Sequence, residues 1–331
     1  MIDLHLHLDG SLSEQDFLYL AKKEKINLSK EFPNNIYVPD NCPSLESYLE
    51  RFNLPLLLLQ KSENITHVTS SLVRRLFKMG YIYAEIRFAP QLHTQKGLTQ
   101  LEVVHAALKG LEEGLKECPG FEANLILCCM RHGSLEVNKE TVEVAYELKE
   151  TRVVGVDLAG AEALHPCSYY KEVFDLAKKY ELNITIHAGE ATGSDEIMMA
   201  IDNGATRIGH GVHLDIKKDG GKVQRKHICF EFCPTSNLQT KSLRSYEECP
   251  LIAFMEKEIP VTINSDNMTV SNTDVYQEYS HLYETYHLTA DQIYQLLSNS
   301  IKYSFADKET KKRLMKKLDE RFETFYRQIT A

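Results

Sequence analysis

The chain has 331 residues, of which 43% are hydrophobic and 26% are charged, a composition typical of a globular protein. Its formal net charge of -9 argues against binding along the phosphate backbone of a nucleic acid and leaves small-molecule substrates open. The longest apolar run, at 54–59, is too short to span a bilayer, so we expect no membrane association.

The N-terminal segment and the cysteines indicate the cellular compartment. No basic stretch followed by an apolar run opens the chain, so we expect no secretory signal. The eight cysteines include no Cys-x-x-Cys pair, and Cys128 and Cys129 lie inside an apolar run. We interpret them as buried thiols rather than as a disulfide framework, and we expect a cytoplasmic protein.

The first predicted strand, IDLHLHL at 2–8, carries two histidines. Side chains alternate between the two faces of a strand, so His5 and His7 share one face with Asp3 and Asp9, and leucines share the other face. A histidine in a strand is more often a hydrogen-bonded core residue than a ligand, so this pair alone does not establish a metal site. Further ligands must come from later strands.

Seven more β-like runs follow the first, separated for the most part by helical patterns. They lie at 81–89, 121–130, 153–159, 183–189, 206–211, 227–234 and 260–266. Helical patterns lie at 44–79, 99–117, 139–150, 168–180 and 195–202, and a helical tail begins at about residue 274.

This alternation predicts a (β/α)8 barrel, a single domain over residues 1–331, with extra helices after the first strand and a helical C-terminal tail. An open doubly wound sheet is the alternative. Its phosphate-binding signature, G-x-G-x-x-G after the first strand, is absent, so the sequence favours the barrel.

Polar side chains follow three of the later strands, at the end where a barrel places its catalytic groups. His187 and Glu190 follow the fifth strand, and His210 follows the sixth. Asp266 and Asn267 follow the eighth. With the two histidines of the first strand, His187 and Asp266 make a set of three imidazoles and one carboxylate, which suits zinc and leaves a position for water. The predicted ligands of one Zn2+ per chain are His5, His7, His187 and Asp266.

Glu190 and His210 are the predicted acid–base groups. Zinc lowers the pKa of a bound water toward neutrality, and His210 could accept its proton or orient the hydroxide. Glu190 lies three residues after His187, where its carboxyl could act as a general acid toward a ring nitrogen or a leaving group. Each residue also has an ordinary interpretation: Glu190 could stabilise the first turn of a helix, and His210 could be structural.

Six motifs resemble those of one family. HLHLDGS, DLAGAE, HAGE, IGHG, CPTSN and NSDN occur in the order and approximate spacing of the adenosine deaminase branch of the metal-dependent amidohydrolases, from the first strand to the eighth. The resemblance implies a zinc-bearing (β/α)8 barrel that hydrolyses the 6-amino group of adenosine and 2′-deoxyadenosine. The products would be inosine or 2′-deoxyinosine and ammonia, in purine salvage.

The resemblance also implies a role for each site residue. Glu190 would protonate N1 of the purine, and His210 would assist the attack of the zinc-activated water on C6. Gly160 would present its backbone N–H to N3, and Asp9 would hydrogen-bond a ribose hydroxyl. The implied substrate contacts are His7, Asp9, Gly160 and Asn267.

Two positions bear on the choice of substrate. Asp9 is the residue that the resemblance associates with adenosine, whereas adenine deaminases of the branch tend to carry Glu there and enzymes that act on N6-methyl-AMP tend to carry Asn. Asn267 departs from the most familiar members, which have an Asp that contacts N7. An amide carries its own N–H donors, so Asn267 is compatible with the same contact.

Two alternatives stay open. One is a deaminase of another aminopurine, either adenine or a modified purine nucleoside, and Asp9 argues against free adenine. The other is a zinc-containing binding or regulatory protein without catalytic activity. Glu190 and His210 argue against that alternative, because neither is needed to hold a metal. Deamination of AMP would need a cationic phosphate site, which the sequence does not locate.

Overall fold

The computed structural model describes residues 1–39, 42–43 and 45–331, and this part of the chain contains eight parallel strands. In chain order they are β1 (Ile2–His7), β2 (Tyr83–Phe88), β3 (Glu122–Met130), β4 (Val153–Ala159), β5 (Thr185–Ala188), β6 (Arg207–His210), β7 (Cys229–Phe232) and β8 (Val261–Ile263). They form two four-stranded sheets, β1-β2-β3-β4 and β5-β6-β7-β8, in which each strand pairs in parallel with its neighbour.

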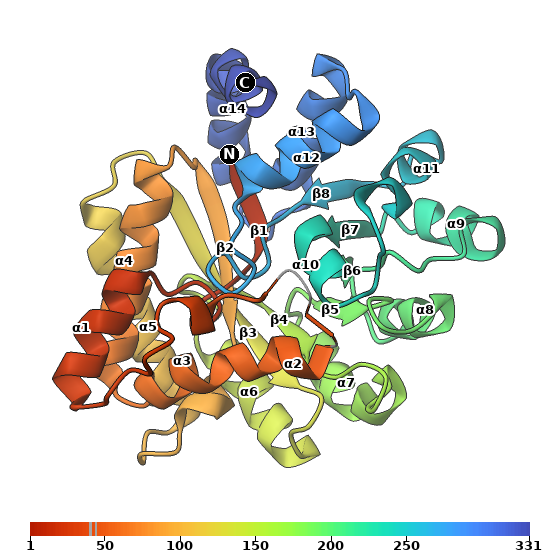
Figure 1. Ribbon diagram of the computed structural model, residues 1–331. Helices are drawn as coiled ribbons and strands as arrows, with labels where there is room; N and C mark the ends of the chain where they lie inside the picture. The colour runs from red at the N-terminus through yellow and green to blue at the C-terminus, as the bar shows by residue number, and fades with distance from the viewer. Residues whose placement is uncertain (40–41, 44) are drawn as a thin grey trace.

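Two seams join these sheets into a closed barrel. At one seam Val156 of β4 forms a parallel bridge with Ile184, and its N–H donates to the carbonyl of Asn183 at 2.9 Å. At the other seam Leu6 of β1 bridges Asp266, just beyond β8. Figure 1 shows the helices arranged around the strands, and the predicted (β/α)8 barrel is confirmed.

Helices connect the strands on the outside of the barrel. They are α1 (Glu14–Glu24), α2 (Leu45–Leu49), α3 (Asn53–Leu58), α4 (Ser62–Lys78), α5 (Gln100–Lys116), α6 (Leu135–Glu147), α7 (Lys171–Lys179), α8 (Ser194–Asp202), α9 (Ile216–Arg225), α10 (Pro234–Gln239), α11 (Leu251–Glu256), α12 (Val275–Tyr286), α13 (Ala290–Tyr303) and α14 (Lys308–Thr330). Short 3-10 turns are η1 (Asn34–Ile36), η2 (Glu50–Phe52), η3 (Pro90–His93), η4 (Cys167–Tyr170) and η5 (Tyr246–Glu248).

Local sequence explains where several of these helices begin. The side chains of Ser13, Thr99 and Thr289 each accept a hydrogen bond from the backbone N–H of the residue three positions later. The side chain of that later residue accepts the backbone N–H of the cap residue in return. Such capping boxes satisfy N–H groups that have no partner within the helix.

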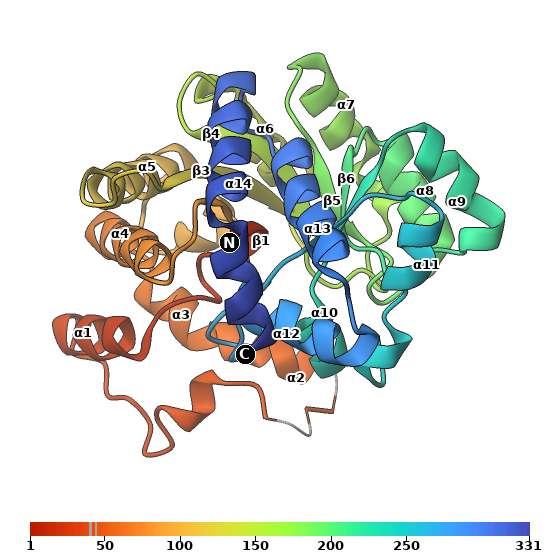
Figure 2. The ribbon, with the colours of Figure 1, turned by 90° about the horizontal axis from the view of Figure 1, so that it is seen from above.

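The extra length of the chain forms an insertion after β1 and a tail, α12–α14, as predicted. The insertion, α1–α3, begins earlier than the predicted helical region at 44–79, which did not include α1. In Figure 1 α2 and α3 cross in front of the strands, and in Figure 2 they lie at the edge of the barrel where α10 also lies. Tyr48 and Phe52 of this insertion line a cavity that His7, His187 and Asp266 also line, so the insertion covers the mouth of the barrel. The predicted start of this helical region, at residue 44, lies outside the described residues.

The strands are buried on both faces, as parallel strands in a barrel must be. Leu4 and Leu6 of β1 belong to one large apolar cluster with Ile86 of β2 and Leu125 of β3, and helical residues such as Leu72 pack against them. All eight cysteines are buried, and the described residues form no disulfide. No helix in the described part of the chain is both long and apolar enough to cross a membrane.

Some element boundaries differ from the predictions, and local backbone geometry explains the differences. The pattern at 260–266 predicts a longer strand than β8, but Asp266 adopts a left-handed conformation with φ 58°. His210 likewise ends β6 at φ 59°. Helix α6 begins before the predicted residue 139, because the Ser134 side chain accepts the N–H of Val137.

Glu278 of α12 is a fully buried carboxyl that joins the tail to the barrel. It accepts hydrogen bonds from the Thr235 N–H at 3.0 Å and the Thr273 hydroxyl at 2.7 Å. Burial raises the pKa of Glu278 to about 7, from an ordinary value of 4.5. Between these two pH values the folded protein holds a proton that the unfolded chain releases, so the contribution of this group to stability falls as pH rises.

We predict that Glu278→Gln makes stability less sensitive to pH, because the amide does not ionise. Between pH 5 and pH 8 the variant should lose about 1–3 kcal/mol less free energy of unfolding than the wild type. Urea unfolding at both pH values measures this difference. Equal losses in the two proteins would contradict the prediction.

Candidate active site

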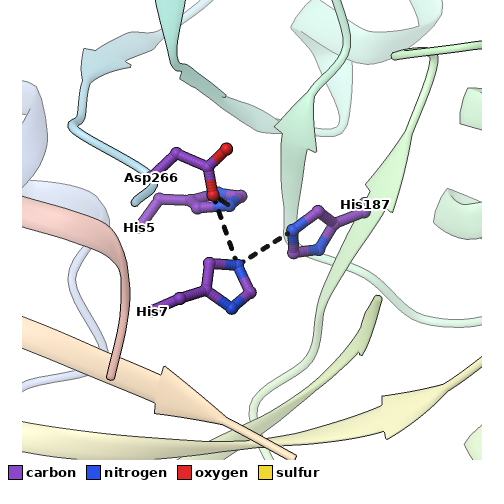
Figure 3. Close-up of side chains that lie close together, drawn as sticks. All are labelled: His5, His7, His187 and Asp266. Carbon is purple, nitrogen blue, oxygen red and sulfur yellow. Dashed lines mark hydrogen bonds and ion pairs between the residues drawn. The ribbon is translucent and has the colours of Figure 1, made fainter. Parts of the chain in front are cut away.

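Four side chains from three strands converge at the carboxyl end of the barrel. His5 and His7 come from β1, His187 from β5 and Asp266 from the turn after β8. His7 Nε2 lies 3.3 Å from His187 Nε2 and 3.4 Å from Asp266 Oδ1, and His5 Nε2 lies 3.5 Å from the same oxygen. Figure 3 shows the four side chains pointing toward one another. One ligand atom from each lies within 4.8 Å of the others, so the structure brings the predicted ligands together.

The seam between β1 and β8 holds three of these ligands in register. The Asp266 N–H donates to the His5 carbonyl at 2.8 Å, and the His7 N–H donates to the Asp266 carbonyl at 2.7 Å. These backbone bonds fix Asp266 against both histidines. Asp266 adopts a left-handed backbone conformation, which costs a residue other than glycine about 1–2 kcal/mol. Such strain is common at functional sites.

Buried carboxylates orient two of the histidine rings. His5 Nδ1 lies 2.8 Å from Glu231 Oε2, and His187 Nδ1 lies 3.0 Å from Asp157 Oδ2. Arg87 bridges these carboxylates, with a guanidinium nitrogen 2.9 Å from each. A carboxylate on Nδ1 fixes the tautomer and directs Nε2 toward the centre of the cluster.

Electrostatics favour neutral imidazoles at the first strand. Burial lowers the pKa of His5, and it lowers that of His7 well below the usual range, so both rings are in the form that binds a metal. Burial also opposes ionisation of Glu231, but Arg87 and Arg207 beside it hold its pKa well below the usual range. The orienting carboxylate is therefore charged.

The residues present fit a metal ion. His5 Nε2 is buried and has no hydrogen-bond partner in the described part of the chain. A buried polar atom without a partner is costly, and an ion at the point of convergence would satisfy this one. Three imidazole nitrogens and one carboxylate oxygen form a donor set that suits zinc.

The two predicted acid–base residues lie beside this cluster. His210 ends β6, and Glu190 lies in the turn after β5. His210 Nε2 is 3.7 Å from Glu190 Oε2, and the ring centroids of His210 and His5 are 5.0 Å apart. The Asn237 amide donates to His210 Nδ1 at 3.1 Å, which places the proton of the neutral ring on Nε2.

A cavity of about 280 Å³ opens onto the cluster. Asp9, Gly160 and Asn267 line it together with His7, so the predicted substrate contacts face one space. Asp9 Oδ1 is buried and has no partner among the described residues. None of the described residues that line the cavity is a lysine or an arginine.

The side chain of Asn267 is held from two sides. Its Nδ2 donates to the Tyr48 hydroxyl at 2.8 Å, and that hydroxyl lies 2.8 Å from Ser271 Oγ. A Cβ on Gly10 would lie 1.9 Å from Asn267 Oδ1, so only glycine leaves room for the amide. An amide has two N–H donors, and Tyr48 occupies one of them.

Several residues of the site were missed by the sequence analysis. Glu231 stands out only as a charge in the apolar run HICFEFCP, and Asp157 belongs to the quoted motif DLAGAE without an assigned role there. Asn237 likewise ends the quoted motif CPTSN without an assigned role. Arg87 and Tyr48 carry no such signal, because their partners Glu231 and Asn267 lie far away in the sequence.

The chain was compared with known families and proteins. The sequence model of a family described as adenosine deaminase matches residues 1–321. An adenosine deaminase of Haemophilus ducreyi is 44% identical, over 97% of this chain and 96% of that protein. An adenosine deaminase of Clostridium acetobutylicum is 40% identical, over 96% of each chain.

A solved structure is also similar along nearly the whole chain. The N6-methyl-AMP deaminase from Arabidopsis thaliana superposes with a TM-score of 0.85 at 26% identity and covers 96% of both chains. Because the family model and relatives well above 30% identity span almost all of the sequence, the chain belongs to the adenosine deaminase family.

Proposed function

We propose that this protein catalyses the hydrolytic deamination of adenosine and 2′-deoxyadenosine, which consumes water and yields inosine or 2′-deoxyinosine and ammonia, in purine salvage. The observation that carries the proposal is the convergence of a four-ligand cluster with Glu190 and His210 on one cavity. A protein that only held a metal would need neither Glu190 nor His210.

The proposed cofactor is one Zn2+ per chain, and the charge of the surroundings supports a divalent cation. When the imidazoles are neutral, four buried carboxylates and two guanidiniums leave an excess of two negative charges. Such an excess is costly in a buried place without a cation. The groups counted are Glu85, Asp157, Glu231, Asp266, Arg87 and Arg207. When bound, zinc lowers the pKa of a water so that it is a nucleophile near neutral pH.

Glu190 and His210 supply the proposed proton chemistry. Glu190 donates a proton to N1 of the purine, which makes C6 more electrophilic. His210 carries its proton on Nε2, held there by Asn237, so it donates a hydrogen bond to the attacking oxygen and stabilises the charge that develops. The water oxygen bonds to C6, and the C6–N bond breaks as the amino group takes up a proton and leaves as ammonia. In the overall balance the two protons of the water account for the proton gained by N1 and the proton gained by ammonia.

The cavity supports a nucleoside as the substrate. Asp9 Oδ1 lacks a partner, and an ionised carboxylate there would accept a ribose hydroxyl. The second N–H of Asn267 would donate to N7, and the Gly160 N–H would donate to N3. A 5′-phosphate would meet none of the cationic side chains that bind phosphate, because the described lining contains no lysine or arginine.

We predict turnover with adenosine and not with AMP or free adenine. Ultraviolet absorbance of the purine, followed in parallel with ammonia release for the three compounds and zinc-loaded protein, measures this. Turnover of adenine would contradict the role of Asp9 and favour another aminopurine as substrate. Inactivity toward all three compounds would contradict the proposed function.

Removal of the metal should abolish turnover and lower the melting temperature, because an ion that binds only the folded state stabilises it. Dialysis against a chelator, followed by metal analysis, thermal unfolding and ammonia assays, tests this expectation. One equivalent of Zn2+ should restore both properties. Full turnover by protein shown to be free of metal would contradict the proposed cofactor.

Glu190→Gln should lower kcat by about 10²–10⁴-fold, because the amide cannot donate the proton to N1. Its metal content should stay unchanged, since Glu190 is not a ligand. Glu247→Gln, at an exposed position of η5, is the matched control and should keep wild-type kcat. The general-acid role fails if Glu190→Gln keeps both its metal and full turnover.

A further inference from the structure

Glu162 is a buried carboxylate to which the mechanism above gives no role. It lies in the loop after β4, two residues beyond Gly160, and is only 3% exposed. No lysine, arginine or histidine in the described part of the chain forms an ion pair with it. Its partners are instead donors from a single segment of the next loop, residues 189–192.

Both carboxylate oxygens accept hydrogen bonds from that segment. Oε1 accepts the Gly189 N–H at 2.5 Å and the Thr192 hydroxyl at 2.6 Å. Oε2 accepts the N–H groups of Glu190 at 3.0 Å, Ala191 at 2.7 Å and Thr192 at 3.3 Å. Four consecutive backbone N–H groups therefore point at one anion, as they do in the backbone nests that bind phosphate.

This arrangement shapes the segment that carries Glu190. Gly189 has φ 73°, and a Cβ there would lie 2.4 Å from Ile197 Cδ1, so the turn is tight at its start. The Gly189 N–H is buried and needs an acceptor, and the N–H groups of the next three residues, which are partly exposed, turn to the same side. A carboxylate has two acceptor oxygens for these N–H groups. A glutamine at position 162 would have one acceptor oxygen, and its NH2 group would face some of the same N–H donors.

The same bonds connect two loops that touch the purine in the proposed mechanism. Gly160 comes from the loop after β4, and Glu190 comes from the loop after β5. Since Glu162 follows Gly160 by two residues and binds the N–H of Glu190 itself, it fixes one loop against the other. Catalysis is sensitive to such spacing, because reacting groups must be held in a near-attack geometry.

We propose that Glu162 is a positioning residue that holds Glu190 at a set place relative to Gly160, so that both meet the same purine ring. The inference rests on the proposed function, since it concerns the proton transfer by Glu190. A residue that acts only through Glu190 should matter little once Glu190 has lost its carboxyl, and this dependence can be measured.

The experiment is a double-mutant cycle on kcat with adenosine, using Glu162→Gln, Glu190→Gln and the double variant. Alone, Glu162→Gln should lower kcat by about 10²-fold with little change in KM, because a small displacement of a catalytic group has that effect. In the Glu190→Gln background it should lower kcat by no more than about 3-fold. Zinc content and far-ultraviolet circular dichroism should match the wild type in all variants.

Glu24→Gln is the matched control. Its carboxylate is also largely buried and accepts from the Asn64 amide at 3.0 Å, but it lies on α1, away from the cavity. It should leave kcat unchanged. If Glu162→Gln does not fold, Thr192→Val removes one donor to the same carboxylate and enters the same cycle, with a smaller loss of kcat that again disappears beside Glu190→Gln.

The outcomes separate the two hypotheses. Wild-type protein that releases no ammonia from adenosine contradicts the proposed function and this inference with it. Active wild type with unchanged kcat in Glu162→Gln contradicts the inference alone. Equal losses in both backgrounds also contradict it, because they would mean that Glu162 supports the fold without acting through Glu190.

Discussion

Arg87 lies between two buried carboxylates, Glu231 and Asp157, and the geometry of the site depends on these ion pairs. Each carboxylate also holds the Nδ1 of one histidine, His5 or His187. Buried charges are stable only when they are paired and hydrogen-bonded. The Arg87 guanidinium therefore allows both carboxylates to remain ionised beside the histidine rings. Removing Arg87 would leave the two carboxylates without the cation between them, and removing either carboxylate would release the ring that it holds.

The same backbone hydrogen bonds close the barrel and hold the residues of the site together. The seam between β1 and β8 is made by backbone hydrogen bonds of Asp266 with His5 and His7. A barrel that failed to close would separate the carboxylate from both imidazoles. The left-handed conformations of Asp266 and His210 end their strands and coincide with site positions, because a side chain must leave the ladder to reach the centre.

The loops add a second level of organisation above the strands. Glu162 ties the loop after β4 to the loop after β5, and Asn237 fixes the ring of His210. Tyr48 brings the insertion onto Asn267 and so links the cover of the cavity to its base. In each case a polar group at the cavity is held by a partner from another part of the chain, which limits its motion.

The sequence by itself determined the fold class, all eight strands and the family, because alternation and six ordered motifs are local properties of the chain. It also predicted His5, His7, His187 and Asp266 as one cluster, since the carboxyl ends of barrel strands must meet. Only the tertiary structure decided which groups orient them. Arg87 and Tyr48 act on partners at least 70 residues away, so no local pattern could indicate their contacts. The tertiary structure also decided where β6 and β8 end, because His210 and Asp266 adopt left-handed conformations that direct their side chains to the site.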